Sequence, residues 1–137
     1  MANKYGIVTG ASRGLGEAIA EELAREGYDV VITYNGNAAK AEAVKTRLES
    51  EFGVRVEMYK LAIQNEDEVI AFRKWAEDTM GKDLQVLVNN AGIYANVPSE
   101  KIESKVFCDI IDVNVKGTFF VNRHFVDLMI ANHFGKI

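Results

Sequence analysis

The stretch "TGASRGLG", Thr9 to Gly16, follows a short apolar run and precedes a segment rich in helix-forming residues. It holds three glycines, although each glycine lowers helix stability by about 1 kcal/mol relative to alanine. We predict that Gly10 allows a sharp turn, Gly14 a close approach to a ligand phosphate, and Gly16 tight packing of the helix on the sheet. The phosphate would bind free backbone N–H groups at the helix N-terminus. The alternative is a tight turn without a ligand.

Short apolar runs suited to strands recur along the chain. Three runs are apolar on both faces, as parallel strands covered on two sides must be: Tyr5–Val8, Asp29–Tyr34 and Leu84–Asn90. A fourth, Val54–Leu61, alternates apolar and charged residues and is predicted to be less buried.

Segments of helical period separate these runs. Apolar residues repeat at helical spacing at Leu15, Ala18, Ile19 and Leu23, and again at Val69, Phe72, Ala76 and Met80. Asn37–Ser50, ended by Gly53, reads as a more polar helix. The alternation predicts an α/β fold of Rossmann type, a doubly wound parallel sheet with right-handed crossovers. Because no Pro- or Ser-rich linker interrupts it, residues 1–137 are predicted to form one domain.

Composition narrows the possible functions. A net charge of −4 and a pI near 5.2 argue against nucleic acid as a partner, because phosphate backbones require a basic face. The single cysteine, Cys108, rules out an internal disulfide and a cysteine-rich zinc site, and we expect it to be a small core residue rather than a reactive thiol. No metal site is predicted. Without a signal peptide or a segment of about 20 apolar residues, the chain is expected to be cytoplasmic and not membrane-bound.

Four stretches together resemble the short-chain dehydrogenase/reductase family: "TGASRGLG" at 9–16, "NNAG" at 89–92, "DVNVKG" at 112–117 and "FGKI" at 134–137. The glycine spacing is similar to that family's cofactor loop, and "FGKI" looks like the start of its fifth strand, where this chain is truncated. Within the family, "DVVITYNGNAAKAEAV" at 29–44 is typical of the 3-oxoacyl-acyl-carrier-protein reductases. The resemblance implies an NAD(P)-binding domain whose C-terminal half is absent.

The resemblance also implies the cofactor-binding residues. They are Gly10, Ser12, Arg13, Gly14, Leu15, Gly16, Asn35, Ile63, Asn90, Ala91 and Gly92. One departure from the family pattern concerns the adenine, because the family's usual Asp or Asn after the third strand is Ala62 here. Ile63 would still pack on the ring, but the side-chain hydrogen bond to the base would be missing.

The charges near the end of the second strand indicate whether the cofactor is NAD or NADP(H). An NAD site places a carboxylate at the end of the second strand, and here that end reads Thr33, Tyr34, Asn35. Asp29 lies at the other end of the strand. With Arg13 beside the glycine loop to pair with a 2′-phosphate, NADP(H) is favoured. The alternative for Arg13 is a solvated surface charge.

Asn114 follows Ile110 by four residues and Phe107 by seven, which predicts an amide on the core-facing stripe of a helix. A buried amide without partners costs about 1–3 kcal/mol, so polar groups must meet it. A hydrogen-bonded core asparagine is one interpretation. The resemblance implies another, in which Asn114 is an active-site residue that holds a water of the family's proton relay.

The family's catalytic Ser and its Tyr-x-x-x-Lys pair are missing, because none of the five tyrosines has a lysine four positions later. His124 and His133 suggest no substitute and are expected on helix surfaces. We therefore interpret the chain as the N-terminal half of a longer reductase. A complete, non-catalytic nucleotide-binding protein is the alternative.

The resulting hypothesis is an NADPH-dependent oxidoreductase that transfers hydride to a ketone such as a 3-oxoacyl thioester. The alternatives are a sugar or alcohol dehydrogenase of the same family and a nucleotide-binding regulatory module. Tyr94 would either stack on the small-molecule carbonyl substrate or cover its own loop. The helix carrying Phe119, Phe120, Val121, Phe125, Val126, Leu128, Met129 and Ile130 is apolar over much of its circumference, which predicts a homo-oligomer, a dimer or tetramer.

Overall fold

A computed structural model describes residues 3–137, and its centre is one parallel sheet of four strands. The strands β1 (Tyr5–Val8), β2 (Asp29–Tyr34), β3 (Val56–Lys60) and β4 (Leu84–Val88) lie in the order β3-β2-β1-β4. The predicted bounds of β1 and β2 are confirmed. β4 is shorter than the predicted Leu84–Asn90, because the chain turns at Asn90, whose N–H donates to the Val88 carbonyl.

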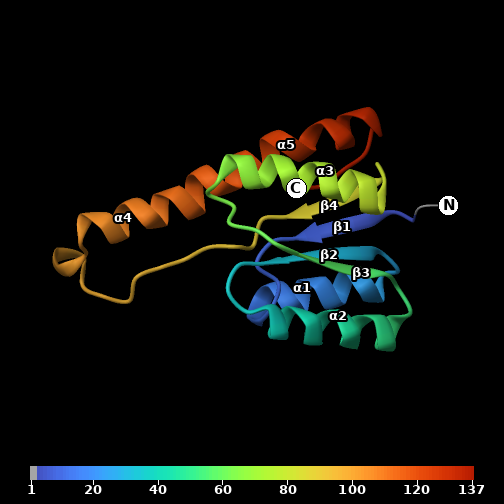
Figure 1. The fold of residues 1–137 in the computed structure, drawn as a ribbon, viewed down its shortest axis with the longest axis horizontal. Helices are drawn as coiled ribbons and strands as arrows, with labels where there is room; N and C mark the ends of the chain where they lie inside the picture. Colours follow the sequence, from blue (N-terminus) through green and yellow to red (C-terminus); the bar gives the residue numbers. More distant parts are fainter. Residues whose placement is uncertain (1–2) are drawn as a thin grey trace.

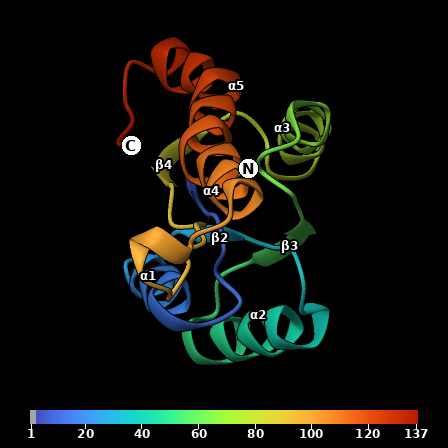
Figure 2. The ribbon, with the colours of Figure 1, turned by 90° about the vertical axis from the view of Figure 1, so that its left-hand side faces the viewer.

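Helices cover both faces of the sheet, which confirms the doubly wound Rossmann-type fold (Figures 1 and 2). α1 (Gly14–Arg25) and α2 (Ala38–Phe52) cover one face, and α3 (Glu66–Met80) and α5 (Thr118–Ala131) the other. Between β4 and α5 the chain forms a 3-10 turn, η1 (Ser99–Lys101), then α4 (Ser104–Ile111) and a single π-helical turn, η2 (Asp112–Gly117). α4 extends past the edge of the sheet (Figure 1). No helix within residues 3–137 has the length and apolar character needed to cross a bilayer.

Polar residues set the ends of the central helices. The Asn37 side chain accepts from the Lys40 N–H at the start of α2, and Gly53 ends that helix in the left-handed region at φ 66°. Asn65 caps α3, whose first turn carries three acidic residues that complement the helix dipole. The predicted position of α2 and its end at Gly53 are confirmed.

The predicted apolar stripe of α1 is confirmed in part, because Ile19 and Leu23 pack against the core, but two of its members face solvent. Leu15 is 71% exposed and Ala18 is exposed, whereas Gly16, Ala20 and Ala24 are buried. At Gly16 the helix lies so close to the loops after β1 and β4 that no side chain would fit.

Two expectations for the helices after β4 are also wrong. Cys108 is exposed, not a core residue, and no residue of α4 is buried. Phe107 and Asn114 are exposed as well, so their stripe does not face the core. The reason is that α4 extends past the sheet and has no core beneath it. His124 is half-buried rather than on the surface, with Nε2 2.8 Å from a carboxylate oxygen of Glu66.

The last residues begin to extend the sheet beyond β4. Lys136 forms a parallel bridge with Val86, its N–H donates to the Gln85 carbonyl at 2.9 Å, and its carbonyl accepts from the Leu87 N–H at 2.9 Å. "FGKI" therefore lies where the sequence predicts the start of a fifth strand.

Candidate functional site

A cavity of about 740 Å³ opens at the carboxyl ends of the strands, bordered by the loops that follow β1, β2, β3 and β4. This volume lies in the range of roughly 300–1,000 Å³ usual for small-molecule sites. The chain passes from β1 outward to β2 and β3 and then returns to place β4 on the other side of β1. Open α/β sheets bind their ligands at such a reversal of strand order.

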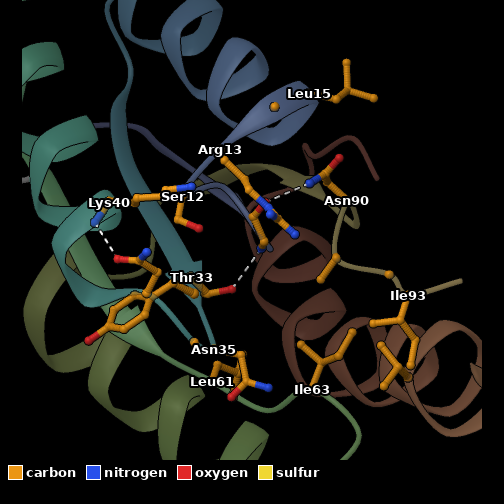
Figure 3. A pocket seen from close by; sticks show the side chains of 18 of the residues that line it. Ser12, Arg13, Leu15, Thr33, Asn35, Lys40, Leu61, Ile63, Asn90 and Ile93 are labelled. Carbon is orange, nitrogen blue, oxygen red and sulfur yellow. Dashed lines mark hydrogen bonds between the residues drawn. The ribbon is translucent and has the colours of Figure 1, made fainter. Parts of the chain in front are cut away.

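The predicted cofactor residues come together here. All of them except Gly16 line the cavity: Gly10, Ser12, Arg13, Gly14, Leu15, Asn35, Ile63, Asn90, Ala91 and Gly92. In Figure 3, Arg13 and Leu15 lie on one side of the cavity and Leu61 and Ile63 on the other. Ile93 and Tyr94 line it too, as expected of the segment 93–104 that the sequence predicts as the near wall of the pocket. Sequence reasoning did not find Thr33, Lys40 and Leu61, which also line it.

Each glycine of the glycine loop, residues 9–16, is needed for a different geometric reason. Gly10 has φ +65°, and a Cβ there would lie 2.9 Å from the Ala91 Cα. Gly14 has φ +59°, and a Cβ there would have no neighbour within 4 Å, so this side of its backbone is open to a ligand. A Cβ on Gly16 would collide with the Asn90 side-chain nitrogen and lie 2.5 Å from the Gly10 carbonyl oxygen. Gly16 therefore allows α1 to lie directly against the two loops.

Hydrogen bonds join the glycine loop to the loop after β4. The buried Thr9 hydroxyl accepts from the N–H groups of Asn90 and Ala91, at 3.1 and 3.0 Å. The Asn90 side-chain amide donates to the carbonyls of Thr9 and Gly10, at 3.1 and 3.0 Å. From β2, the Thr33 hydroxyl accepts from the Gly10 N–H at 3.2 Å. The signal for both threonines was a hydroxyl at the carboxyl end of a buried strand.

The charges around the cavity favour an anionic ligand. Arg13 and Lys40 both line it, and none of the described lining residues is acidic. Asp29, at the other end of β2, is buried and accepts from the Arg55 N–H at 2.9 Å, as expected of a residue outside the site. Nearby Glu17 is paired with Arg47 at 3.1 Å.

Asn114, on η2, holds the loop after β4 instead of facing the core. Its side-chain oxygen accepts from the Ile93 N–H and its amide donates to the Ile93 carbonyl, both at 2.8 Å. π-Helical turns are frequent at functional sites. The amide is therefore hydrogen-bonded on both sides to Ile93, a residue that lines the cavity.

Other candidate groups contribute little. Tyr94 lines the cavity and is 87% exposed, so it does not cover its own loop. Burial raises the pKa of Tyr5 to about 12, and its hydroxyl donates to the Gly81 carbonyl far from the cavity. Within residues 3–137, no group of three or more His, Cys, Asp or Glu side chains is placed to hold a metal ion.

Comparisons with known proteins agree with this geometry. The sequence model of the short chain dehydrogenases matches residues 4–137. The 3-oxoacyl-[acyl-carrier-protein] reductase FabG of Staphylococcus aureus is 41% identical over 116 residues, which cover 85% of this chain and 46% of that protein. The 2-dehydro-3-deoxy-D-gluconate 5-dehydrogenase of Formosa agariphila is 32% identical over 134 residues, covering 98% of this chain and 50% of that protein.

Among solved structures, a metagenomic short-chain oxidoreductase in complex with NADP superposes with a TM-score of 0.89 at 32% identity. The match covers 98% of this chain and 60% of that one. The chain spans about half the length of the curated relatives it matches.

Proposed function

The chain belongs to the short-chain dehydrogenase family, and we propose that it is the cofactor-binding part of a longer NADP(H)-dependent oxidoreductase that transfers hydride to a ketone. One observation carries the proposal: the glycine loop, the Asn90 loop and Arg13 meet around one cavity without an acidic lining residue. A dinucleotide pyrophosphate suits the open backbone of Gly14 and the N-terminus of α1.

The preference for NADP(H) rests on charge. A 2′-phosphate is a dianion, and two basic residues, Arg13 and Lys40, line the cavity together with the uncharged Asn35. A hydrogen bond between charged groups is worth about 1.5–3 kcal/mol, enough for a discrimination of tenfold or more. The NADP complex of the structural relative supports this preference.

The substrate class rests on the near wall of the cavity. Ile93 and Tyr94 line it, and the following Val97 is exposed. An apolar wall suits the acyl chain of a 3-oxoacyl thioester better than a polyhydroxylated sugar, and the Staphylococcus aureus relative acts on such a thioester by its name. A sugar or alcohol dehydrogenase is the second candidate, supported by the Formosa agariphila relative.

The residues of this chain would bind and orient the reactants. The nicotinamide, when bound, supplies the hydride. Asn90, Ala91 and Gly92 would hold its ribose side, and Asn114 would fix Ile93 beside it through the two 2.8 Å hydrogen bonds. We propose that the family's Ser and Tyr-x-x-x-Lys, missing from this sequence, lie in the remainder of the protein.

We expect the full-length protein to oxidise NADPH in the presence of a 3-oxoacyl thioester, with kcat/KM at least about tenfold higher than with NADH. NADPH absorbance follows the reaction, and 5-oxo sugar acids and simple ketones serve as competing substrates. Nucleotide binding without turnover on any carbonyl would identify a regulatory module instead.

Two variants separate the charge argument from general damage to the site. Arg13→Ala should weaken NADPH binding and leave NADH binding unchanged, whereas Asn35→Asp should recover part of the NADH affinity. Equal affinities of the unmodified protein for both nucleotides would contradict the charge argument.

We further propose that the exposed apolar face of α4 and α5 packs against a second copy of the chain. Phe119 on α5 is 60% exposed, and Phe107 on α4 and Val115 on the intervening η2 are exposed as well. Isolated apolar residues are normal at surfaces, but a continuous set marks an interface. Sedimentation velocity of the full-length protein should show a dimer or tetramer that Phe119→Asp dissociates, and a monomeric unmodified protein would refute the interface.

A further inference from the structure

Gly117, the last residue of η2, is buried against the loop that follows β3. A Cβ on Gly117 would lie 2.6 Å from Cγ1 and 2.8 Å from Cδ1 of Ile63, and 3.2 Å from the Ile63 carbonyl carbon. Carbon atoms in contact prefer about 3.5–4.0 Å. The Ile63 side chain thus occupies the space that any side chain at position 117 would need.

Ile63 lies between this glycine and the cavity. It is only 5% exposed, and it lines the cavity together with Leu61 (Figure 3). The backbone around it is held, because the Leu61 N–H donates to the Tyr34 carbonyl at 2.8 Å and the Asn65 N–H to the Ala62 carbonyl at 3.0 Å. A methyl group at position 117 would therefore displace the Ile63 side chain toward the cavity.

We infer that Gly117 is a positioning residue of the cofactor site. Because it has no side chain, the Ile63 side chain stays back from the cavity and leaves room for a flat adenine ring. The inference rests on the proposed function. The same turn fixes Ile93 through Asn114, so η2 sets two walls of the cavity at once. Arg13 and Lys40 supply positive charge at the cavity, and Leu61 and Ile63 supply apolar surface for a base.

The test is a double-mutant cycle in the full-length protein, with dissociation constants of NADPH and of 2′,5′-ADP measured by calorimetry. Gly117→Ala and Ile63→Ala should each weaken both ligands by about tenfold. The double variant should bind like Ile63→Ala alone, because the two atoms that a Cβ at 117 would strike are then absent. The KM for NADPH should rise in Gly117→Ala while kcat at saturating NADPH stays unchanged.

Gly135→Ala is the matched control. Its Cβ would press on the Met129 side chain, including the Met129 Cβ at 2.5 Å, outside the cavity. It should lower the stability of the protein without changing either dissociation constant. The control thus distinguishes overpacking elsewhere in the protein from overpacking at the cofactor site.

The outcomes are distinguishable. If the unmodified protein binds no adenine nucleotide, the proposed function fails. If it binds and the two substitutions add to about a hundredfold loss, Gly117 does not act through Ile63 and this inference alone is overturned. If Gly117→Ala does not fold, the double variant decides: a folded protein with the affinity of Ile63→Ala supports the inference, and an unfolded one overturns it.

Discussion

Replacing Gly16 with alanine is expected to weaken NADPH binding by at least about 100-fold. The added Cβ would collide with the Asn90 amide and lie 2.5 Å from the Gly10 carbonyl oxygen and 2.9 Å from the Ala11 Cα. Two of these three neighbours are backbone atoms, which cannot rotate away. α1 must therefore shift from the glycine loop, and the N–H groups proposed to hold the pyrophosphate move with it. Nucleotide fluorescence titration measures the loss.

Gly6→Ala separates this effect from simple overpacking, which costs about 1–3 kcal/mol wherever it occurs. Gly6 lies in β1, outside the cavity, and a Cβ there would lie 2.9 Å from Cδ1 at the flexible end of the Leu23 side chain on α1. Both variants should lose stability in urea, and only Gly16→Ala should lose the nucleotide. Equal affinity in the two variants would show that α1 need not lie close to the loop for binding.

Sequence patterns predicted the fold well because buried parallel strands and the turns between them have strong local signatures. β1 and β2 are apolar on both faces, and Asn37 and Gly53 mark the ends of α2. The predicted stripe of α1 was right at Ile19 and Leu23 but missed the fully buried residues, because periodicity counts large apolar residues and these are Gly16 and two alanines.

The candidate site was predicted where a motif forces the backbone into one shape. The glycine loop and Asn90 reach the cavity because their turns follow β1 and β4 directly. Lys40 and Leu61 were missed because neither belongs to a recognised motif, and only the tertiary fold brings them to the cavity. Asn114 was expected to face the core because helical spacing alone does not reveal that α4 extends past the sheet.

Thr9→Val is expected to lower the free energy of unfolding by about 2–3 kcal/mol, although the two side chains have almost the same shape. The Thr9 hydroxyl accepts from the N–H groups of Asn90 and Ala91, and valine cannot. The Asn90 N–H keeps a second acceptor, the Val88 carbonyl at 3.1 Å, so the main cost falls on Ala91. Urea denaturation, monitored by circular dichroism, measures the change.

Thr9→Ser tests whether the hydroxyl or the shape of Thr9 holds the two loops together. Serine keeps the acceptor and loses one buried methyl group, which should cost only about 1 kcal/mol. NADPH affinity should depend on the hydroxyl as well. It binds the N–H groups of Asn90 and Ala91 and so holds these two residues beside Gly10, and all three line the cavity. Serine should therefore retain binding, and valine should weaken it by about tenfold or more. If serine and valine lose the same stability and affinity, packing of the Thr9 methyl holds the loops, and the hydrogen bonds contribute nothing measurable.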